Sequence, residues 1–153
     1  MTNPPTEWLH ADQIELDIRS PNKRAVIQAL ADHLNAGSSG GPRAVFDALW
    51  EREMLGSTGL GHGVALPHAR LATLERPIAA FVRLQRAIPF DAPDDKPVAL
   101  VLGLLLPRQE PQRQLELLAH IAGMLSDARF RDALSRADSA ATVARLFTGG
   151  VAT

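Results

Sequence analysis

The apolar positions in the first third of the chain fall at helical spacing. They recur every three or four residues, at Val26, Leu30 and Leu34. This stripe predicts an amphipathic helix with Ser20 as its N-cap and Pro21 at its first helical position, ending in the segment AGSSGG. A second helix is expected from Pro42 to about Met54, just before a glycine-rich segment.

Three apolar segments in the middle of the chain predict strands, at residues 63–67, 78–84 and 98–106. The last of them, VALVLGLLL, is apolar at nearly every position, as expected for a strand that is covered on both faces. A loop rich in proline and aspartate separates the second segment from the third. If the first segment is a strand, His68 lies at its C-terminal end.

Helical patterns return after the third strand. We predict helices at residues 111–126 and 128–137, and a last helix that is capped by Ser139 and ends at Gly149-Gly150. The order of helices, then strands, then helices predicts an α/β fold in which helices pack on a mixed sheet.

The bulk composition suits a single domain, since 153 residues of which 46% are hydrophobic can fill one core. We expect residues 1–7 to form a flexible tail and residues 8–150 to form the domain. A formal net charge of −1 does not indicate the excess of positive charge that is typical of proteins that bind nucleic acid or an anionic membrane. Cysteine is absent, which excludes disulfides, thiolate zinc sites and cysteine nucleophiles.

The sequence also gives expectations about location. The first residues lack the basic start and apolar run of a secretory signal. The longest apolar stretch, 98–106, is far too short to span a bilayer. We therefore expect a cytoplasmic protein that neither inserts into membranes nor binds nucleic acid.

The segment GSTGLGHGVALPHAR, residues 56–70, concentrates glycine in front of a histidine. Its glycines could form a nest of N–H donors for an anion. However, the P-loop pattern requires a terminal Gly-Lys-Ser/Thr, which is missing, and the dinucleotide fingerprint would need glycine at Val64. A tight turn that leads into a strand explains these glycines equally well.

His68 is the candidate nucleophile. Pro67 stiffens the backbone before it, and an imidazole with an ordinary pKa of about 6.5 offers a neutral nitrogen at neutral pH. Such a nitrogen can accept a phosphoryl group without a separate base, but the residues alone slightly favour the alternative, a structural histidine at the end of a strand. His62, six residues earlier, has no third ligand at a clear spacing, so we predict no metal site.

The segment REMLGSTGLGHGVALPHAR, residues 52–70, resembles the active-site signature of a known family, as do AIPFD at 87–91 and LELLAHIAGMLSDARFRDAL at 115–134. The family comprises the IIA proteins of the bacterial phosphoenolpyruvate-dependent phosphotransferase system. The resemblance is to the fructose/mannitol type, and within it to the nitrogen-regulatory branch. It implies an α/β sandwich, in which helices flank a mixed sheet of about five strands on both faces.

The resemblance also implies roles for individual residues. His68 would receive a phosphoryl group from phosphohistidine, and Arg52 would hold phosphate oxygens. Ser57, Thr58 and Gly59 would bind the phosphate, or stabilise the turn instead. Gln114 stands where many members have a second histidine; its amide can donate a hydrogen bond but cannot carry a charge. No cofactor or metal is required, because the donor is already activated.

The partners that the resemblance implies are HPr, or its nitrogen-branch equivalent, as donor and regulatory targets such as potassium transporters and sensor kinases. Leu55, Leu60 and the glycine loop, which comprises residues 56–63, are candidates for the donor's docking surface. One alternative is a sugar-specific IIA protein that passes phosphate to a IIB component. Another, motivated by Gln114, is a regulatory binding module that is not phosphorylated.

Overall fold

A computed structural model describes residues 8–34 and 40–149 of the chain. The expected tail at residues 1–7 lies outside these residues, as does most of the AGSSGG segment. A sheet of six strands forms the centre of the protein, slightly more than the expected five. Its strands are β1 (Ile14–Ile18), β2 (Gly59–Gly61), β3 (Val64–Ala65), β4 (His68–Leu71), β5 (Ile78–Ile88) and β6 (Val98–Pro107).

The sheet is mixed, as predicted. Its order is β1-β5-β6-β3-β2, and β4 pairs with β6 as well. β5 and β6 are antiparallel, whereas β1 runs parallel to β5, and β3 and β4 run parallel to β6. The two long central strands therefore form the frame on which the shorter strands are placed.

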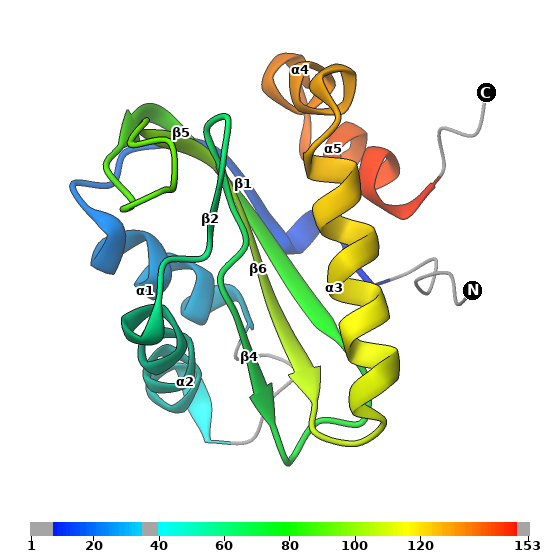
Figure 1. Ribbon diagram of the computed structural model, residues 1–153. Coiled ribbons are helices and arrows are strands. Elements are labelled where there is room, and N and C mark those ends of the chain that lie inside the picture. The colour runs from blue at the N-terminus through cyan, green and yellow to red at the C-terminus, as the bar shows by residue number, and fades with distance from the viewer. Residues whose placement is uncertain (1–7, 35–39, 150–153) are drawn as a thin grey trace.

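Helices cover both faces of the sheet, which confirms the predicted α/β sandwich (Figure 1). One face carries α1 (Lys23–Leu34) and α2 (Gly41–Leu55). The other carries α3 (Pro111–Leu125), α4 (Ala128–Arg136) and α5 (Ala140–Thr148), together with the short 3-10 helix η1 (Ala11–Gln13) near the start of the described chain.

Two hydrophobic clusters fill the space between the sheet and the two helical layers. Neighbouring residues of β6 alternate between them, so that Val101 and Leu105 pack toward α1 and α2 while Leu102 and Leu104 pack toward α3. This alternation explains why the segment is apolar at nearly every position. At Gly103 a Cβ atom would lie 3.0 Å from the Leu30 methyl groups, so glycine lets α1 approach the sheet closely.

The predicted strand at residues 63–67 is wrong in its extent. β3 covers only Val64 and Ala65, and the extended chain resumes at His68 with the same register along β6, where Val64 pairs with Leu100 and His68 with Leu104. Pro67 lies at the break because it has no N–H to donate to a ladder. His68 therefore opens β4 rather than ending a strand.

Two further details of the N-terminal region differ from the expectations. Strand β1 was not predicted, although its IELDI sequence alternates; it is only half buried at the edge of the sheet. The N-cap of α1 is Asn22 rather than Ser20, because the Asn22 side chain accepts a hydrogen bond of 2.9 Å from the backbone N–H of Ala25.

The C-terminal predictions hold. Ser139 caps α5 by accepting a 3.1 Å hydrogen bond from the N–H of Thr142, and Gly149 ends the helix with a left-handed φ of 82°. Within residues 8–34 and 40–149, no helix is long and apolar enough to cross a bilayer.

Candidate functional site

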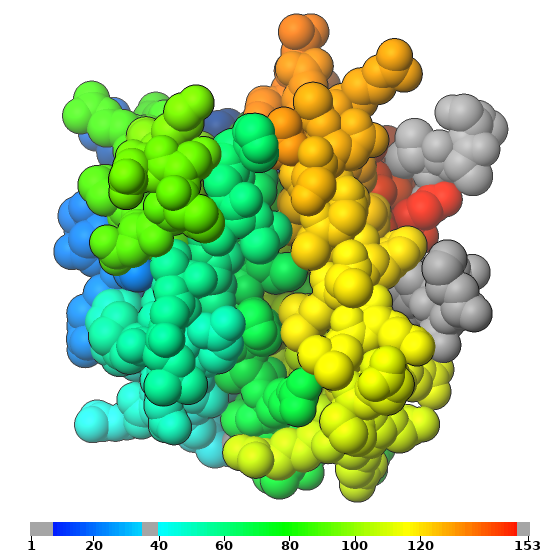
Figure 2. All heavy atoms as spheres, in the orientation of Figure 1, coloured from blue at the N-terminus to red at the C-terminus, as the bar shows by residue number. Residues whose placement is uncertain are grey.

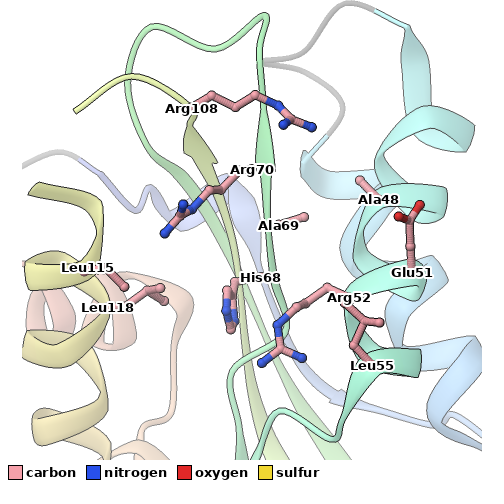
Figure 3. A pocket seen from close by; sticks show the side chains of 10 residues that line it. All are labelled: Ala48, Glu51, Arg52, Leu55, His68, Ala69, Arg70, Arg108, Leu115 and Leu118. Atoms are coloured by element: carbon pink, nitrogen blue, oxygen red, sulfur yellow. The ribbon is translucent and has the colours of Figure 1, made fainter. Parts of the chain in front are cut away.

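His68 lies in a surface pocket of about 380 Å³ between the end of α2 and the start of α3. Figure 2 shows this region in space-filling form. Green residues of the β4 region reach the surface there, with the teal α2 and β2 region on one side and the yellow α3 on the other. The pocket residues are Ala48, Glu51, Arg52, Leu55, His68, Ala69, Arg70, Arg108, Leu115 and Leu118 (Figure 3).

The His68 ring is half-buried and held by one hydrogen bond. Its Nδ1 lies 2.8 Å from the carbonyl oxygen of Leu66. A carbonyl oxygen can only accept, so Nδ1 carries the proton and the neutral ring keeps its lone pair on Nε2. Burial lowers the pKa of His68 below its ordinary 6.5, and the nearby positive charges of Arg52 and Arg70 lower it further. The ring is therefore neutral at pH 7, with Nε2 available as a nucleophile.

Arg52 comes from the last turn of α2. One of its nitrogens, Nη1, donates a 2.9 Å hydrogen bond to the carbonyl of Gly56, just after the end of the helix. The rest of the guanidinium lies beside the His68 ring in the pocket (Figure 3). The two residues thus line the same pocket, and their joint action on one bound anion stays a prediction.

The next residue of α2, Glu53, is fully buried and was not singled out by the sequence. Its carboxylate accepts hydrogen bonds from the Thr58 N–H at 3.1 Å and from the Thr58 hydroxyl at 2.5 Å. It also pairs with Lys23 of α1 at 3.1 Å. Glu53 therefore ties the end of α2, which carries Arg52, to the glycine loop and to α1. Glu53 stands inside the segment 52–70 that resembles the family signature, but the sequence does not reveal its contact with Lys23, which lies 30 positions earlier in the chain.

Ser57, Thr58 and Gly59 lie close to the site but use their polar groups within the loop. The Ser57 hydroxyl donates to the carbonyl of Phe90 at 2.8 Å and accepts from the N–H of Gly59 at 3.0 Å. The Thr58 hydroxyl is held by Glu53. None of the three is among the residues that line the pocket. Their predicted role in binding phosphate stays a prediction, and the contacts agree better with the alternative of stabilising the turn.

Gln114, in the first turn of α3, is buried and points into the protein. Its side-chain amide donates a 3.2 Å hydrogen bond to the carbonyl of Gln109. The pocket wall on this side is formed instead by Leu115 and Leu118. Gln114 is thus not among the residues that line the pocket, and its expected hydrogen bond to phosphate or to His68 stays a prediction.

Two more arginines line the pocket. Arg70 follows His68 on β4, and Arg108 lies between β6 and α3. Arg108 was missed by the sequence reasoning, since only the fold brings this loop to the pocket. Among the described residues, no hydrogen bond or ion pair joins either guanidinium to another side chain or carbonyl. Both are therefore free to take an anionic ligand.

His62, the other histidine of the glycine loop, is exposed and adopts a left-handed φ of 57°. Its backbone N–H donates to the Asp94 carboxylate at 2.9 Å. Across the described part of the chain, no group of three or more histidine and carboxylate side chains is arranged to hold a metal ion.

This geometry can be compared with known proteins. The sequence profile of the family described as "Phosphoenolpyruvate-dependent sugar phosphotransferase system, EIIA 2" matches residues 7–149. The chain belongs to this family. The match includes every residue of the pocket.

Individual relatives come from more than one branch of the family. A nitrogen regulatory protein of Pseudomonas aeruginosa is 45% identical over 98 residues, which cover 64% of each chain. A fructose-specific EIIA component of Haloferax volcanii is 35% identical over 85% of each chain. The crystal structure of nitrogen regulatory protein IIA-Ntr from Neisseria meningitidis superposes with a TM-score of 0.89 at 38% identity, over 92% of this chain and 97% of that one.

Proposed function

We propose that this EIIA protein is a phosphocarrier that accepts a phosphoryl group on Nε2 of His68. The observation that supports this most directly is the bond from Nδ1 of His68 to the Leu66 carbonyl. It directs the lone pair of the neutral ring to Nε2, in a pocket that already holds the guanidinium of Arg52. The phosphoryl donor is phosphohistidine on HPr or its nitrogen-branch equivalent.

The transfer needs little covalent chemistry from the protein. The lone pair of Nε2 attacks phosphorus in line, and the bond from phosphorus to the carrier's ring nitrogen breaks, with its electron pair staying on the carrier. The His68 ring gains positive charge as the new bond forms, which strengthens the hydrogen bond from Nδ1–H to Leu66. Arg52 counters the charge of the phosphoryl oxygens with its remaining N–H groups. Burial of the ring favours attack because it keeps Nε2 unprotonated.

The surface around the pocket supports the docking of a protein donor. Leu55 is 81% exposed at the end of α2, and Leu115 is 50% exposed at the start of α3. Leu60 of the glycine loop is also exposed, as the expected docking surface requires. Large exposed apolar side chains on both sides of a reactive group are typical of a protein–protein contact.

For the biological role we propose nitrogen-linked regulation, in the cytoplasm, through the phosphorylation state of His68. The similarity to nitrogen regulatory proteins supports this role. The targets we propose are of the kind named above, potassium transporters or sensor kinases. The second candidate is a sugar-specific EIIA that passes the phosphoryl group to a IIB component, which the similarity to the Haloferax volcanii fructose component favours.

A reconstituted phosphorylation assay tests the proposal. The protein is incubated with phosphoenolpyruvate, the first enzyme of the system and an HPr-type carrier, and its intact mass is measured. We expect an acid-labile gain of one phosphoryl group in the wild type and in a His62→Ala control, and none in His68→Ala. A wild type that takes up no phosphate from a competent carrier would instead favour the non-phosphorylated binding module. Subsequent loss of the label to a IIB component would favour the sugar-specific role.

A further inference from the structure

Arg70 is placed to act on the same group as His68. The two residues are separated by one position on β4, and alternate side chains of a strand lie on the same face. The residue between them, Ala69, packs into the core on the side of α1 and α2. His68 and Arg70 therefore share the face that turns toward α3.

The His68 ring lies between two guanidinium groups. Arg52 reaches it from α2 on one side, and Arg70 extends on the other side toward Leu115 and Leu118 of α3 (Figure 3). Both arginines act on the ring through their charge, since each contributes to the lowered pKa of His68. The pocket is thus positive on both sides of the nucleophile.

The two guanidinium groups differ in how far they are already occupied. Arg52 uses Nη1 to cap the Gly56 carbonyl, so only its other N–H groups can bind a ligand. Arg70 has no hydrogen bond or ion pair with any other described residue. Elsewhere in the same structure, the strand residue Arg83 is fully engaged by a carboxylate and by backbone carbonyls. Because Arg70 is exposed and has no partner among the described residues, all of its N–H groups are available to an anion from outside the chain.

We propose that Arg70 is a second guanidinium ligand of the phosphoryl group on His68, and that it holds the oxygens from the side opposite Arg52. This inference rests on the proposed function. A phosphoryl group has three equatorial oxygens, and the planar fork of one guanidinium binds two of them at a time. In the transfer, phosphorus leaves the carrier's nitrogen and bonds to Nε2 of His68. Arg70 binds the oxygens of the phosphoryl group during this transfer, and its guanidinium neither loses nor gains a proton.

The test compares Arg70→Ala and Arg70→Lys with Arg86→Ala. Arg86 is an exposed arginine of β5 that does not line the His68 pocket, so its removal controls for the loss of one positive charge. We expect Arg70→Ala to slow phosphorylation by the carrier by about ten- to a hundredfold, the size of effect expected when hydrogen bonds to a charged group are lost. Arg70→Lys keeps the charge but not the planar fork and should recover part of the rate. Arg86→Ala should match the wild type.

A second readout separates direct contact from a structural role. In phosphorylated protein, the pH dependence of the ³¹P chemical shift gives the pKa of the phosphoryl group. A bound guanidinium lowers that pKa. Arg70→Ala should raise that pKa, whereas a variant that is only destabilised would leave it unchanged. If Arg70→Ala is phosphorylated at the wild-type rate and keeps the wild-type phosphoryl pKa, this inference is wrong while the proposed function stands. If the wild type takes up no phosphate at all, the proposed function fails and the inference fails with it.

Discussion

Nδ1 of His68 and the carbonyl oxygen of Leu66 are 2.8 Å apart, within one short segment of the chain. The bond spans the break between β3 and β4, where Pro67 interrupts the ladder. It leaves the imidazole with one free nitrogen and one orientation. The same short segment therefore contains both the break between the two strands and the hydrogen bond that leaves Nε2 as the nucleophilic atom.

The first prediction concerns pH. His68 has a pKa below its ordinary 6.5, so Nε2 stays unprotonated at neutral pH and becomes protonated only in more acidic solution. We expect the His68 ring signals in NMR to titrate with a midpoint below 6.5, and phosphorylation to slow as the pH falls through that midpoint. Because the unfolded chain would bind this proton first, stability should also decline as the pH drops below about 6.5. A midpoint above 6.5 would contradict this account of the site.

The second prediction concerns Glu53. Glu53→Ala leaves the N–H and hydroxyl of Thr58 without their acceptor and removes one of the two carboxylates that face Lys23, the other being Asp91. Breaking a buried pair in this way should lower the free energy of unfolding by about 3 kcal/mol. Urea denaturation measures the loss, and Asp47→Ala, at an exposed position of the same helix, is the control. Equal stability of the two variants would show that the buried network contributes little.

The third prediction concerns Arg83 of β5. Its Nη1 donates to the carbonyls of Leu134 and Ala137 at the C-terminal end of α4, at 3.0 and 2.7 Å, and its other nitrogens bind the Asp17 carboxylate. We expect Arg83→Ala to lower the free energy of unfolding by about 2 kcal/mol, since hydrogen bonds to a charged donor are lost from a largely buried side chain. Arg136→Ala, which loses only an exposed ion pair with Asp132, should cost less than about 1 kcal/mol.

The fourth prediction contrasts two glycines. A Cβ atom at Gly59 would lie 2.9 Å from the Cβ and 3.0 Å from the Cα of Ala92, so Gly59→Ala forces the glycine loop away from its neighbour. At Gly123, inside α3, nothing lies within 4 Å of the added atom. Thermal unfolding should show Gly59→Ala destabilised by about 1–3 kcal/mol and Gly123→Ala stabilised by about 0.5–1 kcal/mol. Any gain in stability for Gly59→Ala would mean that the loop is not packed as described.

The long strands and the helices could be predicted because their signals are local. The apolar run of β6 and the cap of α5 depend on residues that are neighbours in the sequence. Strand β1 was not predicted, because it is short and lies at the edge of the sheet, where only part of its surface is buried. The break at Pro67 was not predicted, because the apolar pattern of residues 63–67 does not show where their pairing with a neighbouring strand is interrupted.

The site was predictable to a different extent. His68 and Arg52 carry the family resemblance, and the fold brings them into one pocket. No role was predicted for Glu53 or Arg108, since the pairing of Glu53 with Lys23 and the place of Arg108 in the pocket depend on segments that are far apart in the chain. For Ser57 and Thr58, the sequence marked hydroxyl groups near the nucleophile but could not show that Phe90 and Glu53 already bind them.

The central claim is that His68 takes up a phosphoryl group on Nε2. The most direct test is ¹⁵N NMR of the imidazole after carrier-dependent phosphorylation of protein labelled with ¹⁵N-histidine. The account predicts phosphorus bonded to Nε2 of His68, with Nδ1 still protonated. Phosphorus on Nδ1, or a label that persists in His68→Ala, would contradict it.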